Sequence, residues 1–82
     1  MKILKFSADY CQPCKSLTGI LEKYGITNYE EIDICSEEGS LLTSKYRVRS
    51  VPTLIKLDNE GNVLDTLVGV KPDNDIKEFF QE

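Results

Sequence analysis

The sequence predicts an α/β domain in which four strands form a mixed sheet flanked by helices, in the order β-α-β-α-β-β-α. Two observations lead to this class. In the first half, short apolar or alternating runs are separated by segments of helical periodicity, and in the second half two β-type runs follow one another across a turn. The 82 residues contain no repeat or low-complexity linker. We therefore expect residues 1–82 to fold as one domain.

The first half of the chain predicts a strand, a helix and a second, parallel strand. Residues 2–6, KILKF, form an apolar run suited to a buried strand. Pro13 suits the first turn of the next helix and Gly25 suits its end. Between them apolar side chains recur at helical spacing: Leu17, Ile20, Leu21 and Tyr24. Residues 28–35, NYEEIDIC, alternate apolar and acidic side chains and predict the second strand.

The second half predicts a helix, a hairpin and a final helix. Ser36 followed by two glutamates is a typical helix start, and this helix is expected to reach Tyr46. Residues 50–69 contain two β-type runs around the turn-forming segment 58–62, which predicts a hairpin. The last helix is expected to begin after Pro72 and Asp73, with an apolar face made of Ile76, Phe79 and Phe80.

Charge and hydropathy argue against two classes of partner. The formal net charge is -4 and the pI is about 4.8, so the chain offers no favourable field to a phosphate backbone. The N-terminal segment lacks the apolar core of a secretory signal, and no run is long enough to span a bilayer. We expect a cytoplasmic monomer that binds neither nucleic acid nor membranes, in a compartment where structural disulfides are rare.

The cysteine pair in "DYCQPCKS" raises three alternatives: half of a zinc site, a structural cross-link, or redox chemistry. The chain has three cysteines and no histidine, whereas a structural zinc site normally needs four such ligands. A zinc site would therefore need Cys35 and a carboxylate, or a dimer bridged by metal. A disulfide between Cys11 and Cys14 closes a loop too short to stabilise the fold much. Reactive thiols, without metal or cofactor, are the favoured interpretation.

The position of the pair at a strand-to-helix junction supports this interpretation. Cys11 is expected among unpaired N–H groups at the positive end of the helix dipole, which favours the thiolate. Cys11 is therefore the predicted nucleophile. Cys14 lies one turn inside the helix and is predicted to resolve the mixed disulfide. Pro13 stiffens the turn between them.

The segments "FSADYCQPCK", "SVPT" and "LVGV" together resemble the thioredoxin superfamily, and specifically a small thioredoxin. The resemblance spans nearly the whole chain. It implies a thiol–disulfide oxidoreductase that reduces protein disulfides through Cys11 and Cys14. It also implies a cis peptide bond before Pro52, with the backbone of Val51 presented to an extended substrate. Residues matching the substrate-binding surface of the family are Tyr10, Gln12, Pro13, Val51, Pro52 and Gly69, with Lys15 as the basic residue after the pair.

The resemblance further implies partners and leaves rivals open. A flavin-dependent thioredoxin reductase is the implied electron donor, and ribonucleotide reductase is one implied client. The sequence begins on the strand that leads to the cysteines, so we expect it to lack the first strand and helix of a full-length thioredoxin, which gives it the size of a glutaredoxin. A glutathione-dependent reductase is therefore one alternative, and a redox-inactive interaction module of the same fold is another.

One pair of positions departs from the pattern of the family. Where the family has a buried acid, this chain has Lys5, and the usual lysine partner falls near Glu31. The two residues either form a pair of reversed polarity that tunes the thiols, or Lys5 extends to solvent from an edge strand.

Cys35 is expected near the active loop, either as a small half-buried hydrophobe or as an auxiliary thiol. The basic run Lys45, Arg47 and Arg49 is expected to end a helix, or to steer an acidic partner.

Overall fold

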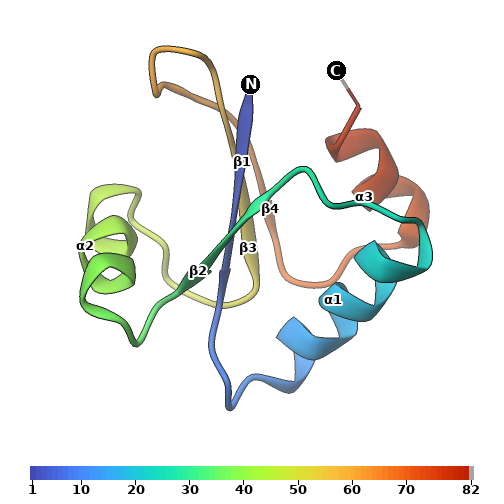
Figure 1. Cartoon of the computed structure of the whole chain (residues 1–82), viewed down its shortest axis with the longest axis horizontal. Helices are drawn as coiled ribbons and strands as arrows, with labels where there is room; N and C mark the ends of the chain where they lie inside the picture. Colours follow the sequence, from blue (N-terminus) through green and yellow to red (C-terminus); the bar gives the residue numbers. More distant parts are fainter. Residues whose placement is uncertain (82) are drawn as a thin grey trace.

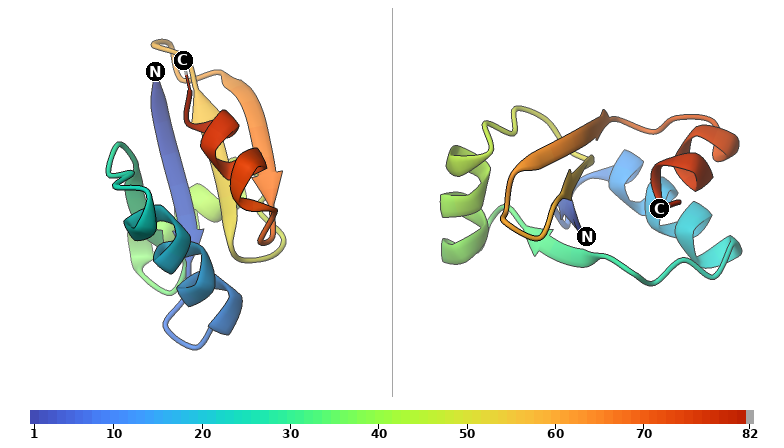
Figure 2. Two further views of the ribbon diagram at one scale, coloured as in Figure 1. Left: turned by 90° about the vertical axis from the view of Figure 1, so that its right-hand side faces the viewer. Right: turned by 90° about the horizontal axis from the view of Figure 1, so that it is seen from above.

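The computed structural model describes residues 1–81 and places a four-stranded sheet between two layers of helices. α1 (Gln12–Lys23) and α3 (Asp73–Phe79) cover one face of the sheet, and α2 (Glu37–Lys45) covers the other (Figure 1 and Figure 2). The strands lie in the order β2-β1-β3-β4. Their bounds are β1 (Lys2–Ser7), β2 (Glu30–Asp33), β3 (Thr53–Leu57) and β4 (Val63–Val68). The order of elements along the chain is the predicted β-α-β-α-β-β-α.

The sheet is mixed, as predicted, and β1 lies inside it. β1 runs parallel to β2 and antiparallel to β3, and β3 pairs with β4 as an antiparallel hairpin. Because parallel strands end at the same edge of a sheet, the residues that follow β1 and β2 meet there. The cysteine loop follows β1, and Ile34 follows β2, so this edge carries the candidate site.

Side chains of β1 alternate between the two faces. Ile3 packs in the core beneath α1 and α3, with Leu17, Leu21, Leu54, Ile76, Phe79 and Phe80. Leu4 and Phe6 pack on the opposite face, under α2, with Ile32, Ile55 and Leu57. Lys5 has the parity of Ile3 and therefore points toward α1. The sequence thus directs one cationic side chain into the layer between the sheet and the helix that carries the cysteines.

The helix ends explain several residues of the loops. α1 ends in a Schellman motif: Gly25 has a φ of 65°, and the Ile26 N–H donates to the Leu21 carbonyl oxygen at 2.9 Å. α2 ends in the same motif, but Arg47 occupies the left-handed position with a φ of 56°. Among residues 1–81, Arg47 is the only residue other than glycine with a positive φ. A side chain is therefore kept where glycine would fit without strain.

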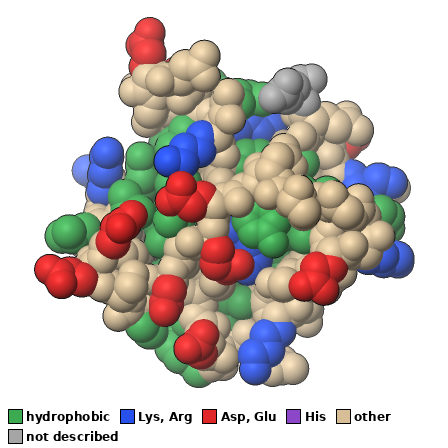
Figure 3. Space-filling model, viewed as in Figure 1, with side chains coloured by type: hydrophobic (Ala, Val, Ile, Leu, Met, Phe, Trp, Pro, Cys, Tyr) green, Lys and Arg blue, Asp and Glu red, His purple; other side chains and the backbone are tan. Residues whose placement is uncertain are grey.

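β2 is shorter than the predicted strand over residues 28–35 and forms an acidic edge of the sheet. Its end is fixed by a turn in which the Ser36 N–H donates to the Asp33 carbonyl oxygen at 3.0 Å. Glu30, Glu31 and Asp33 are exposed, and Figure 3 shows acidic side chains spread over this face of the molecule. Charged side chains on an edge strand oppose pairing with another sheet. No helix in the described part of the chain is long and apolar enough to cross a membrane.

Candidate active site

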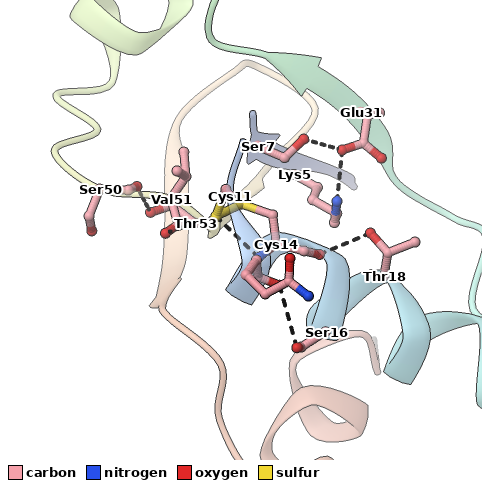
Figure 4. The surroundings of a disulfide bond; sticks show 11 residues. Lys5, Ser7, Cys11, Cys14, Ser16, Thr18, Glu31, Ser50, Val51 and Thr53 are labelled. Carbon is pink, nitrogen blue, oxygen red and sulfur yellow. Dashed lines mark hydrogen bonds and ion pairs between the residues drawn. A yellow bond between two sulfur atoms is a disulfide. The ribbon is translucent and has the colours of Figure 1, made fainter. Parts of the chain in front are cut away.

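Cys11 and Cys14 form a disulfide at the start of α1 (Figure 4). Their Cα atoms are 5.3 Å apart, which is within the usual range for a disulfide. Cys11 is the N-cap residue of α1, and the Cys14 N–H donates to Cys11 Sγ at 3.2 Å. The same donor can stabilise a negative charge on that sulfur after reduction. The predicted position of Cys11 at the positive end of the helix is thus confirmed.

The two sulfurs are shielded from solvent, although the loop around them is not. Cys11 is 7 % exposed and Cys14 is 3 % exposed, and both pack with Ala8. Ile34 and Val51 pack against this group from outside. Sequence reasoning did not single out Ile34, although its place after a parallel strand beside β1 was a usable signal. Gln12 and Pro13 lie between the cysteines and are exposed.

One side of the disulfide is bordered by exposed loop residues. We call Tyr10, Arg49 and Val51 the docking side. Tyr10 is 75 % exposed, and the Val51 carbonyl oxygen lies 3.7 Å from Cys11 Sγ. The Val51–Pro52 peptide bond is cis, which confirms the implied conformation. The Gly69 N–H donates to the Pro52 carbonyl oxygen at 2.9 Å, so the structure brings the "SVPT" and "LVGV" segments together beside the cysteines.

The segment that leads to Val51 carries three exposed basic residues, of which Arg49 belongs to the docking side. A groove of about 250 Å³ is lined by the docking side, and Ile34 and Val48 also line it. Lys45, Arg47 and Arg49 are all exposed, and in the portion that the structure describes none of them forms a salt bridge. Lys45 does contact the ring of Tyr46, with Nζ 5.3 Å from the ring centroid. The two arginines therefore keep their charge available to solvent or a partner.

The other side of the disulfide faces strands β1 and β2 (Figure 4). We call Lys5, Ser7 and Glu31 the buried side, after the burial of Lys5, which is 1 % exposed. Lys5 Nζ lies 2.7 Å from Glu31 Oε2, and the Ser7 hydroxyl donates to the same oxygen (Figure 4). Of the two alternatives posed for Lys5, the structure contains the ion pair. Ser7 was not predicted, but its period-two spacing from Lys5 was a signal for it.

The expectation of a half-buried Cys35 is wrong, because its side chain is exposed. The turn after β2 explains this difference. The Cys35 N–H donates to Asp33 Oδ1 at 2.9 Å, and this short turn directs the chain away from the sheet into α2. Between residues 1 and 81 no group of three or more histidine, cysteine or acidic side chains could hold a metal ion.

Known proteins resemble the chain along its whole length. A family model described as thioredoxin matches residues 1–82. The SPbeta prophage-derived thioredoxin-like protein YosR of Bacillus subtilis is 30 % identical over 82 residues, covering 100 % of this chain and 98 % of that protein. Mouse mitochondrial thioredoxin is 32 % identical over 98 % of this chain, which spans about half of that protein, 49 %.

A solved structure leads to the same family. A mutant thioredoxin from Halobacterium salinarum superimposes with a TM-score of 0.74 and is 31 % identical, covering 94 % of this chain and 68 % of that one. The chain therefore belongs to the thioredoxin family. Together with the Cys11–Cys14 disulfide at the start of α1, this membership supports thiol–disulfide oxidoreductase chemistry.

Proposed function

We propose that this protein reduces disulfide bonds in other proteins by a dithiol–disulfide cycle of thioredoxin type. The observation that carries the proposal is the environment of Cys11. Its sulfur caps α1, accepts the Cys14 N–H at 3.2 Å, and lies beside the groove of the docking side. A helix N-terminus and a backbone donor both favour the thiolate, which is the attacking species in thiol–disulfide exchange.

The reaction has two steps. The Cys11 thiolate attacks one sulfur of the substrate disulfide, that S–S bond breaks, and the other substrate sulfur leaves as a thiolate that takes a proton from water. The Cys14 thiolate then attacks Cys11 Sγ, and the second substrate sulfur leaves. Two electrons have passed to the substrate, and the Cys11–Cys14 disulfide is the oxidised product.

The docking side supports a polypeptide substrate. An exposed aromatic ring and the half-buried Val51 both line the groove, and aromatic side chains of this kind supply contact area at low entropic cost. Arg47 and Arg49 favour a substrate with acidic residues near its disulfide. We infer that the protein acts as a cytoplasmic monomer and is reduced by a thioredoxin reductase, with ribonucleotide reductase as one client.

Insulin reduction tests the proposal. We expect turbidity from precipitating insulin chains when the protein is supplied with thioredoxin reductase and NADPH. Cys11→Ser should reduce the rate to that of the buffer, whereas Cys14→Ser should accumulate a mixed disulfide visible by mass spectrometry. Activity only with glutathione would favour the glutaredoxin-like alternative. If the protein is shown to be reduced and yet has no activity with either electron donor, the proposal is contradicted and an interaction module is favoured.

A further inference from the structure

Lys5 is the only charged side chain in residues 1–81 that is almost completely buried. Its ammonium group pairs with Glu31, whose side chain is 49 % exposed, and the register of β1 and β2 sets the two residues directly opposite one another. A buried ion pair is weak evidence for stability, because replacing it with apolar side chains of similar volume is often neutral or stabilising. The pair therefore calls for an explanation other than stability.

The ion pair lies beside a cavity that Cys14 also lines. Lys5, Glu31 and Cys14 line one cavity of about 680 Å³, with Lys5 on the strand and Cys14 on the first turn of the helix packed over it (Figure 4). Four other charged groups face this cavity, namely Asp9, Lys15, Glu22 and Asp33, and all four are exposed. Water and salt screen exposed charges, whereas a buried charge is screened much less. Of the charged groups that line this cavity, Lys5 is thus the one least screened by water.

We propose that Lys5 is a positioning residue that stabilises the thiolate of Cys14 in the reduced protein, and that Glu31 limits how much of its charge Cys14 feels. The proposal rests on the proposed function. After Cys11 has joined the substrate, Cys14 must lose its proton to water before it attacks Cys11 Sγ. A nearby cation favours the charged form of a thiol. Lys5 takes part in no bond that forms or breaks.

A charge at Lys5 also affects the redox equilibrium of the cysteine pair. A cation that stabilises a thiolate stabilises the reduced state relative to the disulfide. The presence of Lys5 therefore makes the Cys11–Cys14 disulfide easier to reduce and the dithiol a weaker reductant. Glu31 acts in the opposite direction, because it neutralises part of the charge. Removing the charge of Lys5 and removing the charge of Glu31 are therefore expected to change the thiolate fraction of Cys14 in opposite directions. Either change nevertheless breaks the same ion pair.

Alkylation of Cys14 tests this directly and needs no substrate protein. In a reduced Cys11→Ser background, iodoacetamide reacts with Cys14 in proportion to its thiolate fraction, and Cys35→Ser removes the third thiol. We expect Lys5→Met to slow alkylation at pH 7 about tenfold. Glu31→Gln should accelerate it, and Lys5→Arg should leave it within about twofold of the parent. The midpoint of the pH–rate profile should move to higher pH in Lys5→Met.

A glutathione redox titration of the otherwise native protein gives a second readout. Lys5→Met should shift the dithiol–disulfide equilibrium about tenfold toward the disulfide, equivalent to about 30 mV. Equal alkylation rates in the parent and a folded Lys5→Met variant would overturn the proposal, as would shifts of the same sign in Lys5→Met and Glu31→Gln. If Glu31→Gln does not fold, the comparison of Lys5→Met with Lys5→Arg still decides. Failure of the proposed function would instead appear as absent insulin reduction by the wild-type protein.

Discussion

The two sides of the Cys11–Cys14 disulfide are built from different kinds of structure. The docking side consists of loop residues, with Tyr10 75 % exposed and Arg49 in contact with solvent. The buried side consists of two paired strands, and its central residue, Lys5, is 1 % exposed. A loop can adapt to many partners, whereas the pairing of β1 and β2 fixes Lys5 opposite Glu31. In the two proposals made above, one side recognises the substrate and the other controls the second thiol.

The largest expected difference between the two sides is in the free energy of unfolding of matched charge-reversal variants. Lys5→Glu places a carboxylate next to Glu31 beneath α1, and we expect the free energy of unfolding to fall by about 3 to 5 kcal/mol. Arg49→Glu changes an exposed side chain and should alter it by less than about 0.5 kcal/mol. Urea unfolding of both oxidised variants measures the difference. Equal losses in the two variants would mean that the two sides do not differ in the way the burial indicates.

The buried side is also the part of the site that the sequence alone did not determine. The cysteine pair was identifiable because its spacing at a strand-to-helix junction carries the chemistry locally, whereas Pro52 and Gly69 were identified only through the resemblance to thioredoxins. The environment of Lys5 was not identifiable, because a lysine in a strand can either extend to solvent or be buried. Only the packing of α1 over β1, and the register that brings Glu31 opposite, decides between them. The exposure of Cys35 likewise depends on a turn around Asp33.

The fold itself was predictable for a physical reason. Strand and helix periodicities are local, and each element of this chain has a start or stop signal, such as Ser36 before α2 and Gly25 after α1. The left-handed Arg47 was not predictable, since most helices that end in this way use glycine.

The docking side is expected to control the rate of the first thiol exchange. Arg49→Glu should lower the second-order rate constant toward an acidic disulfide peptide about tenfold at low salt, and the difference from wild type should nearly vanish at about 0.5 M salt. Stopped-flow measurement with a fluorescent peptide gives the rate. Lys77→Glu is the matched control, because it changes the net charge equally from an exposed position on α3. Equal slowing by both variants would mean that net charge, and not this surface, governs the rate.

Arg47 should show a smaller effect in which stability and reactivity move in opposite directions. Arg47→Gly removes the strain of a left-handed residue and should raise the free energy of unfolding by about 1 kcal/mol. The same change removes an exposed cation two residues from Arg49, so the rate toward the acidic peptide should fall about twofold to threefold. Arg47→Ala should slow the reaction equally without the gain in stability. If Arg47→Gly reacted as fast as wild type, the arginine would have no part in docking.

The smallest effect is expected at the far end of α1, in a contact that belongs to neither side. The Tyr24 hydroxyl donates to Asp73 Oδ2 at 2.7 Å, joining the end of α1 to α3. This hydrogen bond raises the pKa of Tyr24 above its ordinary 10.0 and lowers the pKa of Asp73 below its ordinary 3.8. The contact needs a protonated phenol and an ionised carboxyl. Its contribution to stability is therefore present between these two ordinary values, is lost as the pH falls through the lowered pKa of Asp73, and is lost as it rises through the raised pKa of Tyr24.

Tyr24→Phe tests whether the reactivity of Cys14 depends on this distant hydrogen bond. We expect the pKa of Asp73, followed by NMR of its carboxyl carbon, to rise toward its ordinary value of 3.8. The difference in the free energy of unfolding between wild type and Tyr24→Phe should be constant near neutral pH and should decrease as the pH falls through the pKa of Asp73. The alkylation rate of Cys14 should not change, because the charge that acts on it comes from the strand beneath α1 and not from the far end of the helix. A change in that rate would mean that the position of α1, rather than the charge of Lys5, controls the second thiol.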